Sequence, residues 1–288
     1  MTLRWNVLTA VVPDALEDEI AAVLGGGSLG VEVAAGGPGT SQVRVYLAPS
    51  EDAQALRTRA CLVLSAHGLP DAASRLAVDV LEDGRWVERW QASLAPIPLG
   101  ERFVVVSSAA APAPAGRDPI HLIPGMAFGT GEHETTRLCA AALERHVAKG
   151  SRWLDLGTGT GLLAIVAARC GASRVLAVDL DPQAVSVATS VVVRNGAADR
   201  VQVREGSIDE RGRERFDGIV ANIQSSFFLA HARSVAAALA DSGVLLASGL
   251  LVEDVPEVGI ALAAEGFAIE EPVADGSWAL LAARCCRS

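Results

Sequence analysis

From residue 153 onward, short apolar runs alternate with helical segments, and this alternation constrains the fold more than any other feature. The apolar runs are WLDL, RVLAVD, RVQVREG, GIVANI and GVLLASG, and segments such as LLAIVAARC and PQAVSVATSVVVRN lie between them. Gly171 and Gly196 follow those two segments, as glycines commonly do where helices end. Continuous apolar strands separated by helices are typical of a parallel sheet that is covered on both faces. We therefore predict an α/β domain with a mostly parallel sheet.

Two extended runs near the C-terminus surround Asp275–Gly276, in FAIEEPVADGSWALLAARC. An Asp-Gly pair between extended runs is a strong signal for a β-hairpin. We therefore expect the sheet to finish with an antiparallel strand, which makes residues 119–288 a Rossmann-like α/β domain.

Residues 1–84 follow a different pattern, in which extended runs and helical segments come in the order βαββαβ. Extended runs occupy residues 4–12, 29–35, 41–48 and 75–81, and helical segments occupy residues 13–24 and 52–67. This order suits a small antiparallel sheet with both helices on one face, so we expect a ferredoxin-like α+β domain. No obvious chemical residues stand out in it, and we expect recognition to be its role. Residues 85–118, which include the Ala/Pro-rich SSAAAPAPAG, are expected to link the two domains.

The segment LDLGTGTG places three glycines between a predicted strand and a predicted helix. Glycines there let the backbone turn tightly and approach a ligand closely, beside the N-terminus of a helix. A dinucleotide fingerprint would need glycine where Leu162 stands, and no Gly-Lys-Ser/Thr phosphate loop occurs. Asp155, just before the first glycine, would repel pyrophosphate but attract the ammonium group of an amino acid. A strand–helix turn without a ligand is the alternative interpretation.

Acidic and polar residues follow the next two predicted strands. Asp179 ends the second strand, roughly 20 residues after the first glycine, where an acid can accept hydrogen bonds from both ribose hydroxyls. Asp181 is expected to cap the helix that starts at Pro182. Ser207 and Ile208 follow the third strand, where an adenine would lie, and Ile208 would offer it an apolar face. Together these features describe a nucleoside with a cationic amino-acid end and no phosphates, and S-adenosylmethionine fits that description.

The segment PGMAFGTGEHETT, followed by DLGTGTG, VDLDP, EGS and ANI, closely resembles the PrmA family of class I methyltransferases. The resemblance runs from about residue 121 to the C-terminus and includes WVERW and PIPLGERFVV upstream; in residues 1–84 it is one of organisation. It implies an enzyme that uses S-adenosylmethionine to methylate amino groups of ribosomal protein L11. It also implies that residues 1–84 recognise the substrate. SSAAAPAPAG, and IQSS after Asn222, depart from the residues usual in the family, which leaves the fine substrate contacts open.

The loops and the resemblance together give the candidate cofactor-binding residues: Phe128, Thr130, Thr136, Asp155, Gly157, Gly159, Asp179, Ser207 and Asn222. Four of them match cofactor-contact positions of the family: Thr136, Gly157, Asp179 and Asn222. We expect PGMAFGTGEHETT to fold over the sulfonium end of the cofactor while DLGTGTG runs beneath it. Phe128 would screen the reacting methyl group from water. Thr135 or Thr136 would cap the helix that follows.

Asn222, at the end of the fourth predicted strand, is the candidate catalytic residue. Its side-chain carbonyl can accept a hydrogen bond from the incoming amine and orient the nitrogen lone pair toward the methyl group. A free lysine has a pKa of about 10.4, so a site that desolvates the amine beside a cationic sulfur favours the neutral nucleophile. Positioning can then supply much of the acceleration. The alternative is that Asn222 only forms a turn.

Several other functions deserve comparison. His133 and Glu134 would need a second histidine where Arg137 stands to form the zinc motif HExxH, so we expect no metal. A methyltransferase for lysines of an electron-transfer flavoprotein subunit resembles the same catalytic half, but the extra N-terminal domain favours ribosomal protein L11. An RNA methyltransferase would want a basic stripe, and residues 211–215 are too short to supply one. A non-catalytic module that binds the cofactor or NAD is the alternative from a different class.

Composition adds weaker expectations. The net charge of −10 argues against non-specific nucleic-acid binding and suits a basic protein substrate. The five cysteines show no CxxC spacing, which fits free thiols in a reducing compartment. No apolar segment reaches about 18 residues, so we expect a cytoplasmic protein without membrane contact. We further expect a monomer that does not bind nucleic acid directly. The sequence leaves open which amino groups are methylated and how many methyl groups are added.

Overall fold

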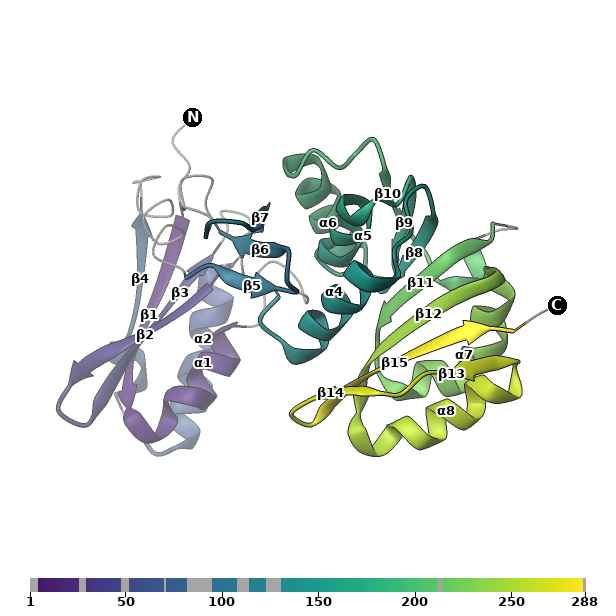
Figure 1. The fold of residues 1–288 in the computed structure, drawn as a ribbon. Coiled ribbons are helices and arrows are strands. Elements are labelled where there is room, and N and C mark those ends of the chain that lie inside the picture. Colours follow the sequence, from purple (N-terminus) through teal and green to yellow (C-terminus); the bar gives the residue numbers. More distant parts are fainter. Residues whose placement is uncertain are drawn as a thin grey trace. The chain divides into compact units, whose positions relative to one another are not determined.

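The computed structural model describes residues 5–25, 30–47, 52–69, 71–81, 95–107, 114–122, 131–211 and 214–286. These residues divide into two compact units (Figure 1). We call them the N-terminal unit, whose described residues lie within 5–81, and the C-terminal unit, whose described residues lie within 95–286. The chain passes from one unit to the other through residues outside the described part, so the predicted boundaries 1–84, 85–118 and 119–288 stay a prediction.

The N-terminal unit is a four-stranded antiparallel sheet with two α-helices. Its elements are β1 (Trp5–Pro13), η1 (Asp14–Leu16), α1 (Glu17–Gly25), β2 (Gly30–Gly37), β3 (Thr40–Leu47), α2 (Ala53–Ala66), η2 (Ala72–Arg75) and β4 (Leu76–Leu81), where η denotes a 3₁₀ helix. The strands lie in the order β2-β3-β1-β4. The βαββαβ order of strands and α-helices is the expected one, and membership of the ferredoxin-like class stays a prediction.

Alternation along β1 separates the two faces of this sheet. Leu8, Ala10 and Val12 are fully buried, and they pack with apolar residues of both α1 and α2 in one core. Both helices therefore cover the same face, as expected from the order of the elements. The helix predicted from residue 13 begins as the 3₁₀ helix η1 and becomes α-helical at Glu17. Asp52 caps α2 by accepting the N–H groups of Gln54 and Ala55.

The C-terminal unit contains an eight-stranded sheet. From β8 onward its elements are β8 (Arg152–Leu156), α5 (Leu162–Cys170), β9 (Arg174–Asp179), α6 (Pro182–Arg194), β10 (Val201–Glu205), η3 (Ile208–Arg211), β11 (Phe216–Asn222), α7 (Ser225–Ala238), β12 (Leu239–Leu251), η4 (Val252–Asp254), α8 (Val255–Ala264), β13 (Phe267–Ile269), β14 (Val273–Asp275) and β15 (Trp278–Cys285). The strand order is β10-β9-β8-β11-β12-β15-β13, and β14 pairs with β15. Strands β8 to β12 run parallel, whereas β13, β14 and β15 form antiparallel pairs. The predicted α/β fold and its antiparallel finish are confirmed.

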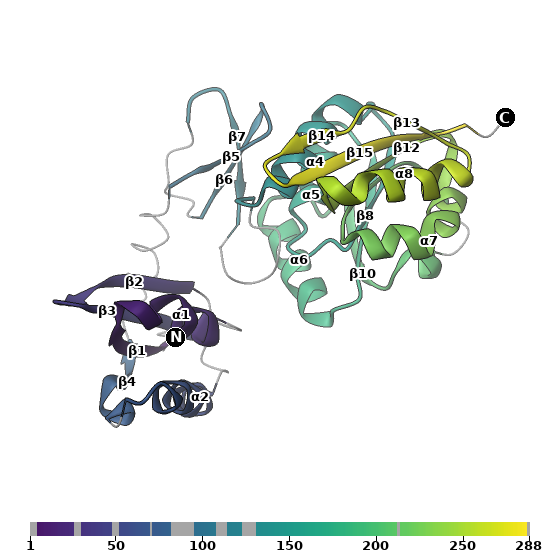
Figure 2. The ribbon, with the colours of Figure 1, turned by 90° about the horizontal axis from the view of Figure 1, so that it is seen from below.

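Helices cover both faces of this sheet (Figures 1 and 2). The helices α4 (Glu134–His146), α5 and α6 share one core with inward side chains such as Trp153, whereas α7 and α8 share the other core with side chains such as Leu154. Neighbouring residues of one strand thus enter opposite cores. Gly218 leaves room for Trp153, because a Cβ atom at residue 218 would lie 2.4 Å from the indole ring.

A second, three-stranded sheet belongs to the C-terminal unit. It contains β5 (Ile97–Leu99), β6 (Phe103–Val106) and β7 (Asp118–His121), with β6 antiparallel to β5 and parallel to β7. Leu99, Phe103 and Ile120 are fully buried and join the core that contains α4 and α5. Part of the stretch predicted to link the domains is therefore ordered sheet. The Ala/Pro-rich run falls mainly on residues 108–113, which lie outside the described residues.

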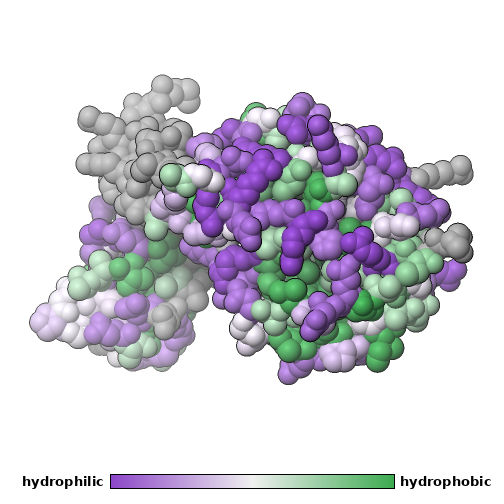
Figure 3. Space-filling model, viewed as in Figure 1, coloured by the Kyte–Doolittle hydropathy of each residue, from purple (hydrophilic) through white to green (hydrophobic). Residues whose placement is uncertain are grey.

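The surface and the cysteines add two observations. Hydrophobic patches interrupt the mostly hydrophilic surface of the C-terminal unit (Figure 3), and Ile260 and Val252 are among its exposed apolar residues. All five cysteines are free, as predicted, with Cys139 and Cys285 buried and Cys286 exposed. In the part of the chain that the structure describes, no helix combines the length and the apolar character needed to cross a bilayer.

Candidate cofactor site at the switch point of the sheet

The order of the strands creates a crevice between β8 and β11. From β8 the chain adds β9 and β10 on one side, and then crosses to add β11 and β12 on the other side. Ligands of open α/β sheets bind outside the carboxyl ends of the strands at such a switch point. Leu156 pairs with Ala221 in the register of the two strands, so the glycine loop after β8 and Asn222 at the end of β11 lie at the same edge. The two candidate features are thus brought together.

The glycine loop follows β8 and adopts a conformation that favours glycine at three places. Gly157, Gly159 and Gly161 have φ angles of 69°, 55° and 80°. In that left-handed region a residue with a Cβ atom is strained. The N–H groups of Gly157 and Thr158 both donate to the carbonyl of Val178 at 2.9 Å, which ties the loop to β9. The backbone therefore passes the strand ends with no side chain at the three glycines, as expected for close approach to a ligand.

Asp155 lies beneath this loop and is 1 % exposed. Its Oδ2 accepts a hydrogen bond from the Thr158 hydroxyl at 2.6 Å and another from the backbone N–H of Ala164 at 3.0 Å. Burial raises the pKa of Asp155 to about 7, and the negative charge of Asp179 contributes. The carboxyl group braces the loop against the first turns of α5. Direct attraction of a ligand ammonium group by Asp155 stays a prediction.

Asp179 ends β9 as predicted, and both of its carboxylate oxygens accept backbone N–H groups. Oδ2 accepts from Gly159 at 2.9 Å, and Oδ1 accepts from Asp181 at 3.0 Å. Asp181 in turn caps α6 by accepting the N–H of Gln183, which confirms the predicted cap. Because each carboxylate oxygen has two lone pairs, Asp179 retains acceptor capacity for the hydroxyls of a ribose.

The segment after β10 lies beside the same strand tip. The N–H of Gly206 donates to the backbone carbonyl of Asp179 at 2.9 Å, which places the candidate Ser207 next to the end of β9. Ile208 is fully buried and belongs to the core that contains α7 and α8. Its side chain therefore supports the sheet from within, and the expected open apolar face for an adenine is not what this structure shows.

Thr136 and Asn222 meet across the crevice although they are far apart in the sequence. The amide Nδ2 of Asn222 lies 3.5 Å from the hydroxyl oxygen of Thr136, which is at the outer limit of a hydrogen bond. Thr136 is almost completely buried, and Asn222 is partly exposed. No other residue in the described ranges forms a hydrogen bond with the Asn222 side chain. This arrangement directs the amide N–H toward Thr136 and leaves the amide oxygen for a different partner.

His133, rather than either threonine, caps α4. Its Nδ1 accepts the N–H of Thr135 at 3.3 Å and lies 2.8 Å from the Thr135 hydroxyl oxygen. The prediction that Thr135 or Thr136 caps the helix is therefore wrong. Because α4 begins at Glu134, both threonines lie inside its first turn, and both are buried. His133 therefore fixes the start of α4 through its side chain.

Two candidates, Phe128 and Thr130, lie outside the described residues, as do residues 124–127 and 129 of the segment PGMAFGTGEHETT. Their predicted roles, and the folding of that segment over the cofactor, stay predictions. The first described residue after them, Gly131, has a φ angle of 96°. A Cβ atom there would lie 3.1 Å from Val105 and 3.6 Å from Leu162. Gly131 therefore lies close to side chains of β6 and of the start of α5.

The sequence interpretation missed the residues that hold the N-terminus of α4. Arg137 forms an ion pair with Asp275 at 2.9 Å and also donates to the carbonyl of Glu132. The His133 ring packs edge-on against Trp278, with 4.9 Å between the ring centroids. The hairpin of β14 and β15 thus supports the end of α4 that carries Thr136. The only local signal was the Asp-Gly turn, which predicted the hairpin but not what it touches.

The chemistry of the loops fits a cationic nucleoside without phosphates. The strand-end segments 157–161, 179–181, 206–208 and 222–224 contain no lysine or arginine. A pyrophosphate site would require such donors or a phosphate loop, whereas the two acids Asp155 and Asp179 favour positive charge. The described residues contain no cluster of three or more His, Cys, Asp or Glu side chains arranged to hold a metal ion.

An open α/β sheet of this order, with a glycine loop at its switch point and an acid at the next strand tip, defines a class I S-adenosylmethionine-dependent methyltransferase. The family described as "Ribosomal protein L11 methyltransferase (PrmA)" matches residues 33–285. This chain therefore belongs to the PrmA family, and its cofactor is S-adenosylmethionine.

Individual relatives agree with the family assignment. A ribosomal protein L11 methyltransferase from Pelotomaculum thermopropionicum is 41 % identical over 247 residues, which cover 85 % of this chain and 80 % of the relative. One from Halorhodospira halophila is 38 % identical over 243 residues, which cover 83 % and 80 %. The crystal structure of a ribosomal protein L11 methylase from Lactobacillus delbrueckii subsp. bulgaricus superposes with a TM-score of 0.62 at 31 % identity, covering 67 % of this chain and all of that one.

Proposed function

We propose that this enzyme methylates amino groups of ribosomal protein L11, the protein for which its relatives are named. The observation that carries the proposal is the position of Asn222. It lies at the end of β11, beside the end of β8 and the glycine loop, with its amide N–H directed at Thr136. The amide oxygen is then available as an acceptor, and the N–H group of an amine nucleophile can donate to it.

In this proposal, the bound S-adenosylmethionine supplies an electrophilic methyl group on a cationic sulfur. Asn222 Oδ1 accepts one N–H of the substrate amine and so orients the nitrogen lone pair. Thr136 supports the amide from behind, because its hydroxyl oxygen lies 3.5 Å from Asn222 Nδ2. Neither Asn222 nor Thr136 has to act as a base, because the neutral form of the amine, which desolvation favours, already carries the lone pair. Orientation of this kind can account for several powers of ten in rate.

Asp155 and Asp179 provide negative charge at the cofactor side of the crevice. Burial raises the pKa of Asp155 to about 7, so near neutral pH its carboxyl group is close to half ionised. A cationic ligand nearby favours the ionised form of a carboxylate. We propose that Asp155 binds the cationic end of the cofactor electrostatically and that Asp179 binds its ribose. The loop bonds of both acids would hold them in place for these tasks.

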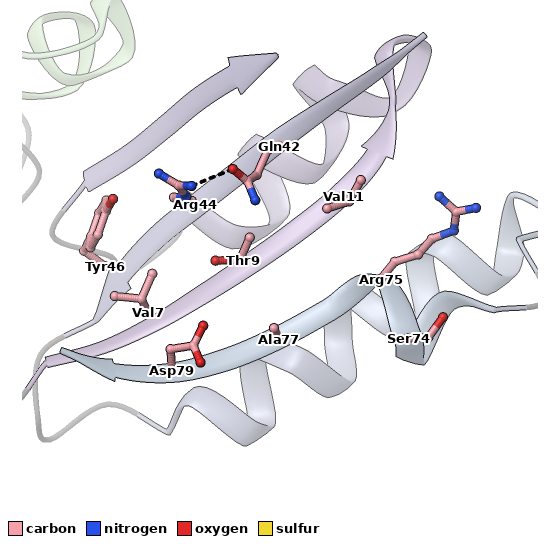
Figure 4. Close-up of a pocket in the computed structure, with 10 residues that line it drawn as sticks. All are labelled: Val7, Thr9, Val11, Gln42, Arg44, Tyr46, Ser74, Arg75, Ala77 and Asp79. Atoms are coloured by element: carbon pink, nitrogen blue, oxygen red, sulfur yellow. Dashed lines mark hydrogen bonds between the residues drawn. The ribbon is translucent and has the colours of Figure 1, made fainter. Parts of the chain in front are cut away.

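We further propose that the N-terminal unit recognises the protein substrate through the sheet face that its helices leave uncovered. This face carries a hollow of about 470 Å³ in which side chains of β1, β3 and β4 project from alternate positions (Figure 4). Thr9, Val11 and Ala77 lie there, partly or fully exposed, opposite the buried Leu8, Ala10 and Leu76. Such a surface combines apolar contact with hydrogen-bonding groups.

A polar cluster gives this face a defined edge. The hydroxyl of Tyr46 donates to Glu32 at 2.7 Å, and Arg44 lies 3.8 Å from the same carboxylate. Burial and the bond to Glu32 raise the pKa of Tyr46 well above its ordinary value, so Tyr46 stays a donor at physiological pH. Arg44 also donates to Gln42 at 2.7 Å, as the dashed line in Figure 4 shows. The charges are mixed, so we propose that the face selects shape and hydrogen bonds more than net charge.

The proposal is tested by incubating the purified chain with isotope-labelled S-adenosylmethionine and three separate acceptors. These are ribosomal protein L11, an electron-transfer flavoprotein subunit and ribosomal RNA, and mass spectrometry locates the label. The proposal predicts label on lysine or N-terminal amino groups of ribosomal protein L11 only. Label on another acceptor, or none on ribosomal protein L11 while the cofactor binds, would overturn the proposed substrate but not the assignment of the enzyme class. A cytoplasmic location, a monomeric state and the absence of direct nucleic-acid binding stay predictions.

A further inference from the structure

A second hollow lies on the C-terminal unit, away from the cofactor crevice. It has a volume of about 570 Å³, within the range of roughly 300–1,000 Å³ that is usual for small-molecule sites. It is lined by four arginines, a histidine and an aspartate: Arg102, Arg169, Arg194, Arg200, His121 and Asp118. Arg200 immediately precedes β10, and Arg169 and Arg194 lie in the last turns of α5 and α6. The hollow is therefore at the amino ends of the strands, the edge opposite the glycine loop.

Backbone contacts hold the hollow in shape. The side-chain amide of Asn195 pairs with both backbone groups of His121, accepting its N–H at 2.8 Å and donating to its carbonyl at 2.8 Å. Arg169 donates to the carbonyls of Pro119 and Asn195. These contacts join β7 to the ends of α5 and α6. Arg169 is thus oriented by carbonyl oxygens and not by a carboxylate, so its positive charge is fixed in place without being neutralised.

Positive charge exceeds negative charge in this hollow. Asp118 pairs with Arg102 at 2.9 Å, and Asp199 lies 3.5 Å from Arg200. Within the described ranges, neither Arg169 nor Arg194 forms an ion pair. Two arginines therefore line the hollow without a carboxylate partner in the described part of the chain. This local excess stands out in a chain whose net charge is −10.

The titrating groups respond to this excess. Burial lowers the pKa of Arg169, and the charges of Arg102 and Arg200 lower it further, against the opposing effect of Asp118. Burial also lowers the pKa of His121, together with the charges of Arg169 and Arg194. In addition, the Nδ1 atom of His121 is buried and has no hydrogen-bond partner among the residues that the structure describes. Buried polar atoms are almost always hydrogen-bonded, so this atom calls for a partner.

We propose that this hollow binds the phosphate group of a small phosphate ester. Guanidinium groups present planar forks of donors that match the oxygens of a phosphate. An anion would offset the excess charge and could give His121 Nδ1 an oxygen partner. The helix dipole accounts for Arg169 and Arg194 at helix ends. It does not account for Arg102 and Arg200, which are not in helices, or for the unpaired ring nitrogen.

A nucleic-acid backbone is the other source of phosphate, and its binding would depend differently on salt concentration. A small ester would bind through one phosphate group, so further phosphates linked to it would add little to the affinity. A nucleic-acid backbone would cross the open hollow and contact arginines with successive phosphates, so its affinity would fall steeply as salt concentration rises. The site is local and does not require the basic stripe of a non-specific nucleic-acid binder.

The test uses the full chain and three probes: inorganic phosphate, adenosine monophosphate and a short RNA duplex. Binding is measured by isothermal titration calorimetry in chloride buffer at two salt concentrations. The variants are Arg194→Glu, Arg194→Lys and the matched control Arg233→Glu, which makes the same charge change at an exposed position of α7. Arg194 is exposed and forms no ion pair with the residues that the structure describes, so its replacement should leave the fold intact. Binding of S-adenosylmethionine, at the opposite edge, confirms folding of each variant.

We expect saturable binding of inorganic phosphate or the monophosphate, weakened about tenfold or more by Arg194→Glu, changed less than about threefold by Arg194→Lys, and unchanged by Arg233→Glu. Equal or tighter binding of the monophosphate than of RNA supports the small ester, whereas tighter binding of RNA with a strong salt dependence overturns the proposal. Absence of saturable binding for all three probes overturns the proposal. An equal effect of Arg194→Glu and Arg233→Glu also overturns it, because the binding would then follow overall charge.

Discussion

The carboxylate of Asp179 accepts the backbone N–H of Gly159 at 2.9 Å, and this bond joins the tip of β9 to the loop after β8. The other oxygen of the same carboxylate accepts the N–H of Asp181, at the start of α6. One side chain thus fixes two of the loops that border the crevice. A ribose bound to Asp179 would therefore meet a carboxylate that is already oriented, and preorganisation of this kind reduces the loss of entropy on binding.

Replacing Gly157 by alanine should impair cofactor binding more than stability alone explains. At a φ angle of 69° an alanine costs about 1–2 kcal/mol, and its Cβ would lie 3.0 Å from the Ile223 side chain. Displacing Ile223 disturbs the backbone beside Asn222, because Ile223 directly follows Asn222. The matched control is Gly196→Ala, which has a φ angle of 63° and nothing within 4 Å of the added atom.

Both variants should lose a similar amount of stability from the backbone, measured as the free energy of unfolding in urea. Gly157→Ala should in addition weaken S-adenosylmethionine binding by about tenfold or more, roughly 1.4 kcal/mol, whereas Gly196→Ala should leave it unchanged. Equal cofactor affinity in the two variants would remove the glycine loop from the site.

Cofactor binding should strengthen as pH rises from 6 to 8. The pKa of Asp155 is about 7 in the folded chain, so its ionised fraction rises about tenfold across that interval. Calorimetric affinity for S-adenosylmethionine should follow this fraction in the wild type. In Asp155→Asn the affinity should be lower at pH 8, and the dependence attributable to residue 155 should disappear. An identical pH profile in both proteins contradicts a binding role for Asp155.

The same raised pKa has an opposite consequence for the stability of the protein without cofactor. The folded state holds the Asp155 proton more tightly than the unfolded state, in which the pKa of Asp155 is near 3.8. Its contribution to stability is therefore complete below about pH 4 and is lost as pH rises through about 7. At pH 8, Asp155→Asn should melt at a higher temperature than the wild type in the absence of cofactor. A lower melting temperature would show that the charged brace stabilises the fold.

Replacing Asn222 by alanine should lower kcat on the order of 10²-fold while changing the dissociation constant of S-adenosylmethionine by less than about threefold. The amide is assigned to the substrate amine, so its loss removes orientation and leaves the bonds of Asp155 and Asp179 in place. Single-turnover kinetics and calorimetry measure the two quantities separately. Thr136→Ser, which retains the hydroxyl, serves as a control with nearly normal kcat. Equal losses of turnover and cofactor affinity would take the catalytic role from Asn222.

A bulky cation on the uncovered sheet face should weaken recognition of the protein substrate. Ala77→Arg places it among Thr9, Val11 and Arg75, which line the hollow of the N-terminal unit. We expect KM for the protein substrate to rise about tenfold, with cofactor affinity unchanged. Ala55→Arg makes the same replacement at an exposed position of α2. If both variants, or neither, raise KM, the face is not the recognition surface.

Local sequence patterns predicted most of the C-terminal unit because each signal acts within a few residues. The run RVLAVD became β9 with the predicted ends, Asp181 capped α6, and Gly171 ended α5. The hairpin at Asp275–Gly276 formed as expected. In each case, the cause is local: apolar alternation, a side chain that caps its own helix, or a glycine with a positive φ angle.

Contacts between distant residues could not be predicted in the same way. The residue that caps α4 is His133 and not a threonine, and its ring also packs on Trp278, more than a hundred residues away. The Arg-lined hollow joins β7, α5 and α6, and its arginines are scattered along the sequence. Asp155 was predicted as a ligand group, and its hydrogen bonds to Thr158 and Ala164 emerged only from the fold. Which carboxylate oxygen accepts hydrogen bonds from its own loop depends on packing, which no local pattern encodes.

The most direct test of the central claim is a crystal structure of the chain grown with S-adenosylhomocysteine, the product of methyl transfer. We predict that the ribose binds to Asp179, that the amino-acid end lies by the glycine loop above Asp155, and that the sulfur faces Asn222. An empty crevice at the carboxyl ends of β8 and β11, or the ligand bound with its sulfur away from Asn222, would contradict the claim.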